Sequence, residues 1–348
     1  MVPTTMDRAQ EERRRREATV RPVRLWLFVV AALIFAMVVV GGLTRLTESG
    51  LSITEWAPLL GALPPLSDAD WHAAFERYRE IPQYRLLNAG MTLDDFRFIY
   101  WWEWSHRLLG RLIGVVFVVP LVAFVIGGRI PRAELPRHLT LLALGAEVAP
   151  LRLAVHLTLA AGLYAAVLWT ALTLSARGRA PRPSPIRRIG AGAVLGWVFV
   201  QIFLGALVSG NHAGLVYDTW PLMNGHLMPP DVFTITPLWL DLIENPATVQ
   251  FLHRIGAYVL FALVIAQFVT IVVTARTATA RVSAFALGFA VAFQIMVGIS
   301  TLLMHVPFAL ALIHQATAMA VLTAAVIHAV SVFAPGRMET TLLHHDGG

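Results

Sequence analysis

“GGLTRLTESGLSITEW”, residues 41–56, closes a long apolar stretch and recurs 164 positions later as “GALVSGNHAGLVYDTW”, residues 205–220. The two segments match at Gly41/Gly205, Leu43/Leu207, Gly50/Gly214, Leu51/Leu215 and Trp56/Trp220. Two further pairs follow in the same order, “EWSHR” with “QFLHR” and “RLAVHLTLA” with “LALIHQATA”. A repeat that keeps the order of its landmarks predicts two structurally similar halves.

The composition places both halves in a membrane. The chain is 57% hydrophobic and only 14% charged, so it lacks the polar surface that a soluble protein of this length needs. Stretches of a length that crosses a hydrocarbon core of about 30 Å lie at residues 25–43, 108–127, 153–175, 189–208, 251–274, 282–304 and 308–333. The chain has no cysteine, which excludes disulfides, iron–sulfur clusters and thiolate-bound haem.

Arginines set the expected orientation. They flank the apolar stretches at Arg13–Arg16, Arg129, Arg132, Arg137, Arg177, Arg179, Arg182, Arg187, Arg188, Arg276 and Arg281. We interpret these groups as cytoplasmic topology signals, not as a nucleic-acid-binding surface. No cleavage site follows the first span, and the N-terminal segment also contains acidic residues. The sequence therefore predicts a multi-pass protein of the bacterial inner membrane with a cytoplasmic N-terminus.

One membrane crossing is missing from this count. The arginines at 129–137 and those at 177–188 should share a side, yet only one long apolar stretch separates them. The candidate for the second crossing is “LTLLALGAEVAP”, residues 139–150, which as a helix reaches about half way through the bilayer. It is either a short re-entrant helix or the remnant of a longer span.

The predicted fold is an all-α integral membrane protein. It has two tandem four-helix bundles related by a pseudo-twofold axis along the membrane normal, nominally eight transmembrane helices with the third shortened. The expected segments are a cytoplasmic Arg-rich N-terminus (1–24), the first half (25–176), a cytoplasmic linker (177–188), the second half (189–335) and a cytoplasmic tail (336–348).

Four histidines occupy equivalent places in the two halves: His106 and His156 in the first, His253 and His314 in the second. All four are expected near the outer ends of their helices, on the periplasmic side. Two imidazoles that face each other at one depth in a bundle can bind haem iron from both sides, so we predict one haem in each half. The alternative is that these histidines form interhelical hydrogen bonds. His305, near the outer end of another span, has no counterpart.

Residues beside these histidines have two interpretations each. Arg107 and Arg254 directly follow the first histidine of each half. They can bind haem propionates or extend their side chains to the membrane interface. The aromatic set Tyr100, Trp101, Trp102 and Trp104 fits an interfacial aromatic belt or the wall of a porphyrin pocket.

Glu103 distinguishes the first half from the second, where Gln250 takes its place. Each lies three residues before a predicted iron ligand, on the same helix face. Only the glutamate can transfer a proton or stabilise a developing positive charge. This asymmetry predicts a reacting haem in the first half and a permanent one in the second. The alternative is that Glu103 only interacts with an arginine at the level of the lipid headgroups.

These segments, with “AGLVYDTWPLMNGHLMPP” and “FLHRIGAY”, resemble the cysteine-free haem A synthase family of proteobacteria and mitochondria. The resemblance implies oxidation of a ring methyl group of haem O to the formyl group of haem A, for cytochrome oxidase assembly. It further implies that His106 and His156 hold the substrate haem O beside Glu103, and that His253 and His314 ligate a haem b cofactor. The expected partners are haem O synthase, cytochrome oxidase assembly proteins, membrane lipid and a second copy of the chain, with no nucleic acid.

The chain departs from this family in its third helix, which is shortened between His106 and His156. Either the helix is deleted, or residues 139–150 form a partial substitute. Two other functions also fit the residues: a membrane electron carrier with two permanent haems b, and a non-catalytic haem-binding assembly factor.

Overall fold

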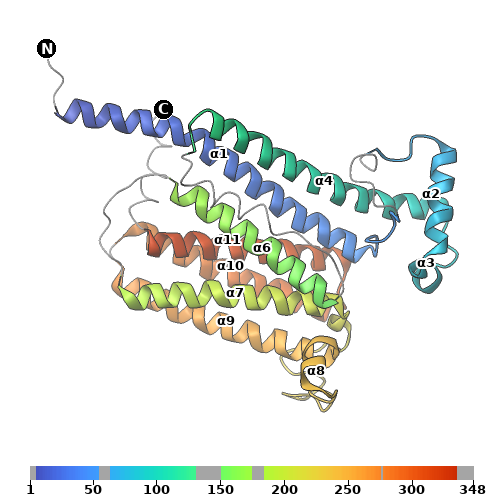
Figure 1. Ribbon diagram of the computed structural model, residues 1–348. Coiled ribbons are helices and arrows are strands. Elements are labelled where there is room, and N and C mark those ends of the chain that lie inside the picture. Colours follow the sequence, from blue (N-terminus) through green and yellow to red (C-terminus); the bar gives the residue numbers. More distant parts are fainter. Residues whose placement is uncertain (1–4, 55–62, 131–149, 175–183, 276, 335–348) are drawn as a thin grey trace. The chain divides into compact units, whose positions relative to one another are not determined.

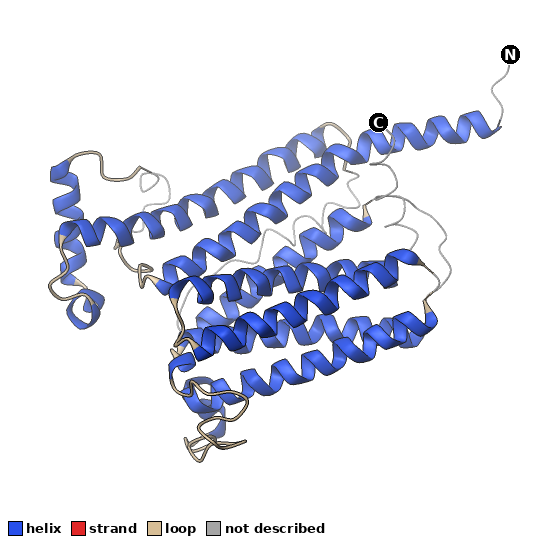
Figure 2. Ribbon diagram, turned by 180° about the vertical axis from the view of Figure 1, so that it is seen from behind, coloured by secondary structure: helices blue, strands red, loops and turns tan. Residues whose placement is uncertain are grey.

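The computed structural model describes residues 5–54, 63–130, 150–174, 184–275 and 277–334. Seven of the helices within these ranges are long and apolar enough to cross a membrane, which confirms the seven predicted spans and the all-α fold. They are α1 (Thr5–Leu46), α4 (Leu93–Ile126), α6 (Pro150–Thr173), α7 (Pro185–Gly210), α9 (Pro246–Thr274), α10 (Ala278–Leu303) and α11 (Phe308–Phe333). Figure 2 shows the helices and the loops that connect them.

Several predicted features fall outside the described ranges. The expected short third helix at 139–150 lies in residues 131–149 except for its last residue, and the tail 336–348 is also outside. The shortened crossing and the division into two four-helix halves therefore stay predictions. Described residues before the first span add one finding: α1 begins at Thr5, so the Arg-rich N-terminus continues as helix into the membrane span.

The chain divides into two compact units, Ala32–Leu121 and a larger unit that joins Met1–Ala31 to Val122–Gly348. In the larger unit α6, α7, α9, α10 and α11 lie side by side (Figure 1). Helix α7 contacts α6, α9 and α11, and α10 contacts α9 and α11. Alanines such as Ala154 and Ala206 are buried between helices, because small side chains let membrane helices approach closely.

A buried polar cluster joins four helices of this unit near the ends of α9 and α11 and the starts of α7 and α10. His328 of α11 contacts the Gln267 amide on α9 (2.9 Å) and the Ser283 hydroxyl on α10 (3.0 Å). Gln267 also donates to the Arg187 carbonyl on α7. Interhelical hydrogen bonds of this kind hold membrane helices together, so His328 has a structural role.

The smaller unit carries an extramembrane subdomain. At 1.5 Å per residue, the 34 residues of α4 extend about 50 Å, well beyond a hydrocarbon core of about 30 Å. Helices α2 (Asp68–Glu80) and α3 (Pro82–Leu87) belong to this unit, and aromatic rings of α2 and α4 form its core. Tyr100 is buried there against Trp71, with ring centroids 4.9 Å apart. Tyr100 is thus part of a protein core, an option that the sequence analysis did not include.

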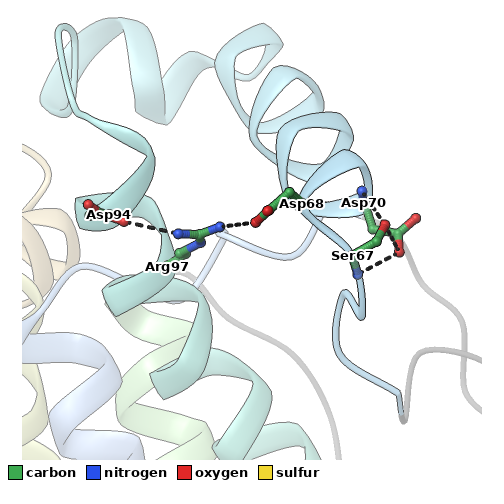
Figure 3. Close-up of polar contacts among 5 residues, drawn as sticks. All are labelled: Ser67, Asp68, Asp70, Asp94 and Arg97. Atoms are coloured by element: carbon green, nitrogen blue, oxygen red, sulfur yellow. Dashed lines mark hydrogen bonds and ion pairs between the residues drawn. The ribbon is translucent and has the colours of Figure 1, made fainter.

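Charged side chains fix the start of α2 to α4 (Figure 3). Arg97 of α4 pairs with Asp68 of α2 at 2.9 Å and with Asp94 of its own helix at 3.1 Å. Ser67 and Asp70 form a reciprocal capping box at the first turn of α2. Such a box satisfies helix N–H groups that would otherwise lack a partner.

Candidate functional site

The structure brings His253 of α9 and His314 of α11 together. Their ring centroids are 6.4 Å apart and the ring planes cross at 78°. A metal–imidazole bond is about 2 Å long, and ring bonds of about 1.3 Å place each nitrogen about 1.1 Å from its ring centre. An iron between two imidazoles would require centroids about 6 Å apart, and the observed 6.4 Å is close to this distance.

Glycines lie against three of the four predicted ligands. A Cβ atom added to Gly205 would lie 3.2 Å from Cε1 of His253, and one added to Gly298 would lie 2.8 Å from Cε1 of His314. In the first half a Cβ on Gly41 would lie 3.0 Å from Cε1 of His106. Gly41 and Gly205 are an aligned pair of the repeat, so the same close approach of helix backbone to imidazole occurs in both halves.

His106 and His156 lie on α4 and α6, and both are partly buried. His106 belongs to the smaller compact unit and His156 to the larger one. Their pairing around a second haem stays a prediction.

Glu103 is buried and its carboxylate accepts hydrogen bonds at both oxygens. The Ser52 hydroxyl (2.8 Å) and the Ile53 backbone N–H (2.7 Å) donate to Oε2. Arg107 donates to Oε1 from Nε (3.0 Å) and from Nη2 (2.5 Å). The ion pair of the alternative interpretation is therefore present. It does not decide whether Glu103 also acts on a substrate.

The second half repeats this arrangement with a neutral side chain. Gln250 is buried, and its amide donates to the Tyr217 carbonyl (2.9 Å), as does Arg254 (2.9 Å). Tyr217 aligns with Ile53, whose carbonyl accepts from Arg107 at 2.8 Å. In each half, an arginine on the helix that carries the first histidine thus donates to the backbone carbonyl of the aligned loop residue. This correspondence supports the internal repeat.

Both predicted propionate-binding arginines have contacts within the chain. Arg254 donates to the Thr219 carbonyl (2.8 Å) in addition to the Tyr217 carbonyl, and Arg107 holds Ile53 and Glu103. Each guanidinium thereby fixes the loop next to a predicted haem ligand. Binding of propionates by these arginines stays a prediction.

The loop of the second half is itself anchored to the start of α9 through Asp241 of α8 (Leu238–Glu244). Burial opposes ionisation of Asp241, but donors on Thr248, Ile235 and Asn245 outweigh it and lower the pKa of the carboxyl. Burial, with a hydrogen bond to Asp231, raises the pKa of Tyr217 to about 12. Hydrogen bonds to Asp241 therefore hold this loop to the start of α9.

His305 lies in the turn between α10 and α11, with a left-handed backbone (φ 62°). Its Nε2 atom lies 3.2 Å from a carboxylate oxygen of Asp218, and both side chains are exposed. These contacts link the turn to the loop of the second half.

Comparison with known proteins shows the family of this chain. The family model of COX15-CtaA, described as cytochrome oxidase assembly protein, matches residues 24–326. The chain belongs to this family. A protein of Parvibaculum lavamentivorans named heme A synthase is 47% identical over 90% of this chain and 94% of its own length. A heme A synthase of Caulobacter sp. is 49% identical over 90% of this chain and 97% of its own.

Two glutamines lie beside the candidate haem ligands, and sequence reasoning assigned a role to neither of them. The Gln201 amide nitrogen lies 3.1 Å from Nδ1 of His253, and that of Gln294 lies 3.2 Å from Nδ1 of His314. The signal was present as “QIFLG” (201–205) and “QIMVG” (294–298). Comparing the two helices within the second half would have found it.

Proposed function

We propose that this chain is a haem A synthase, which oxidises a ring methyl group of haem O to the formyl group of haem A. The observation that carries the proposal is the match to heme A synthases at 47% and 49% identity over nearly their full lengths. The four histidines and Glu103 all lie within the range of the family match.

In this proposal His253 and His314 hold a resident haem b. The 6.4 Å spacing of their rings and the glycines against both imidazoles fit such a group. When bound, the haem b would supply one-electron chemistry beside the reaction. The chain's own contribution is to fix the two imidazoles and to bury them between α9 and α11.

Haem O is the proposed substrate, held between His106 and His156. Glu103 would accept a proton from the reacting methyl group or stabilise positive charge that develops there. Arg107, Ser52 and the Ile53 N–H fix the orientation of this carboxylate.

The proposed location is the bacterial inner membrane, with a cytoplasmic N-terminus and both haem sites near the periplasmic side. Three of the four histidines lie within roughly three turns of the start of their helices. In this proposal an enzyme that makes haem O supplies the substrate to this site. A cytochrome oxidase assembly factor receives the haem A that is formed.

The test is conversion of haem O by the wild type and by Glu103→Gln, each supplied with haem O in cells without another synthase. Gln250 shows that glutamine is accommodated at the equivalent place, so the variant should fold. We expect haem A from the wild type, and bound but unconverted haem O in the variant. Equal haem A yields would eliminate the role of Glu103, and no haem A from either protein would contradict the proposed activity.

A further inference from the structure

The loop and short helix that precede α9 expose several large apolar side chains. Leu227 and Met228 of the loop and Leu238 and Trp239 of α8 are all exposed, Leu227 by 84% and Trp239 by 63%. We call these four residues the α8 patch. Asp241 of the same helix is buried, so α8 presents apolar residues outward and its carboxylate inward. Exposed apolar patches mark contacts with a membrane or with another protein.

Buried hydrogen bonds hold α8 to the start of α9. Asn245 ends α8 and caps α9, and its side chain accepts from the Ala247 N–H at 3.0 Å. Asp241 accepts from the Thr248 hydroxyl on α9 and from the Asn245 amide, the latter at 3.0 Å. Because these residues are buried, leaving their polar groups without partners would be costly. The depth of α8 in the membrane therefore follows the depth at which α9 begins.

Helix α9 is long enough to reach the lipid headgroups at both ends. Its 29 residues extend about 43 Å at 1.5 Å per residue, and a bilayer with its headgroup regions is about 40–45 Å thick. A span centred in the bilayer therefore begins in the headgroup region, and α8 lies there with it. Figure 1 shows α8 and the loop before it displaced across the direction of α9 instead of along it, and Figure 2 agrees. The α8 patch is thus beside the bundle, at the level of the headgroups.

The charge and composition of this stretch favour lipid over a protein partner. Residues 189–253 contain neither lysine nor arginine, so no cation here attracts an acidic protein or an anionic headgroup. A basic protein could pair with the exposed Glu244, but it would have to displace lipid to reach the patch. Tryptophan is enriched at membrane interfaces because its ring is apolar and its N–H is polar. Leucine and methionine side chains gain from burial at the boundary of the acyl chains.

We propose that the α8 patch inserts into the membrane leaflet at which α9 begins, with its side chains between the headgroups and the upper acyl chains. Apolar burial supplies the contact, so zwitterionic and anionic phospholipids both fit.

The inserted segment is connected to the loop beside a candidate haem ligand. The Asn245 amide donates to the Asp231 carbonyl at 2.9 Å, and the Tyr217 hydroxyl donates to the Asp231 carboxylate. The Tyr217 carbonyl in turn accepts from Arg254 at 2.9 Å, the residue directly after His253. Lipid thus fixes one end of a series of contacts that reaches the residue next to His253.

The test uses single nitroxide labels, which the chain accepts without other substitutions because it has no cysteine. Trp239→Cys and Leu227→Cys place a label in the patch, and Val269→Cys places one on the exposed face of α9 within the span. Glu244→Cys is the matched control, at an exposed polar position of α8. Each labelled full-length protein is placed in nanodiscs of phosphatidylethanolamine and phosphatidylglycerol. EPR then measures collisions with oxygen, which enters the bilayer, and with a water-soluble nickel chelate, which does not.

We expect both patch labels to lose most collisions with nickel and to keep those with oxygen, as the Val269 label does. The Glu244 label should keep its nickel collisions. Nanodiscs of phosphatidylcholine alone should give the same result, because the contact needs no anionic headgroup. Free access of nickel to the patch labels would show that the patch faces water and would overturn the proposal. Exclusion of both nickel and oxygen would show that protein covers the patch, and would overturn it equally.

Discussion

The substitution Gly298→Ala tests the packing of the resident haem site directly. Its Cβ would lie 2.8 Å from Cε1 of His314, whereas carbon atoms in contact prefer about 3.5–4.0 Å. The imidazole or α10 must therefore move by roughly 0.7 Å or more. Overpacking of this kind costs about 1–3 kcal/mol, which corresponds to about a five- to 150-fold loss of haem affinity if the cost falls on the ligand.

Gly288 on the same helix provides the matched control. A Cβ there meets no atom within 4 Å, so Gly288→Ala should keep haem binding and stabilise the helix by up to about 1 kcal/mol. Gly205→Ala, with a contact of 3.2 Å, should give an intermediate loss. The assay is haem b per polypeptide after purification, followed by titration of haem-depleted protein with haem b. Wild-type affinity in a folded Gly298→Ala protein would refute the assignment of His314 as an iron ligand held by α10.

Three further predictions follow from the described contacts. Gln250→Glu should loosen the loop of the second half, because it places a carboxylate near the Tyr217 carbonyl to which Gln250 now donates. We expect faster amide hydrogen exchange over residues 216–220. Unchanged exchange would contradict this prediction. The Ser67 and Thr92 hydroxyls hold the pKa of Asp70 and of Asp95 below the ordinary value. These caps therefore stabilise α2 and α4 above about pH 4, and the stabilisation is lost as the pH falls through the lowered pKa. Limited acid proteolysis at residues 63–70 would detect the loss, with Asp70→Asn as the pH-insensitive comparison. Because the pKa of Tyr217 is about 12, Tyr217→Phe should remove the highest-pH step of the tyrosine absorbance titration, and loss of a step near the ordinary tyrosine pKa would contradict the buried contact with Asp231.

The membrane spans could be predicted from the sequence because length and hydropathy alone determine them. The pair His253 and His314 could be found because a repeat identifies equivalent positions without any knowledge of helix packing. Its iron-binding role stays a prediction, but the two rings do lie together. The arginine contact of Glu103 was also foreseeable, since residues four apart share a helix face.

Other features depend on partners that are distant in the sequence. Tyr100 was assigned to an interfacial belt or a porphyrin wall because its neighbours are aromatic, yet it is buried against Trp71 of α2, a partner that lies 29 residues earlier in the sequence. Gln201 is one polar residue in an apolar helix, and only the position of α9 shows that it contacts His253. Hydropathy describes how a helix meets the membrane and not which neighbour it meets.

The central claim is that this protein holds two haems with different fates, one resident and one a substrate. Extraction of the pigments from the purified full-length protein, followed by mass analysis, tests it most directly. We expect haem b together with haem O, haem A or a hydroxylated precursor, and loss of haem b alone in His253→Ala. Two equivalents of haem b, with neither haem O nor haem A, would contradict the claim and indicate an electron carrier.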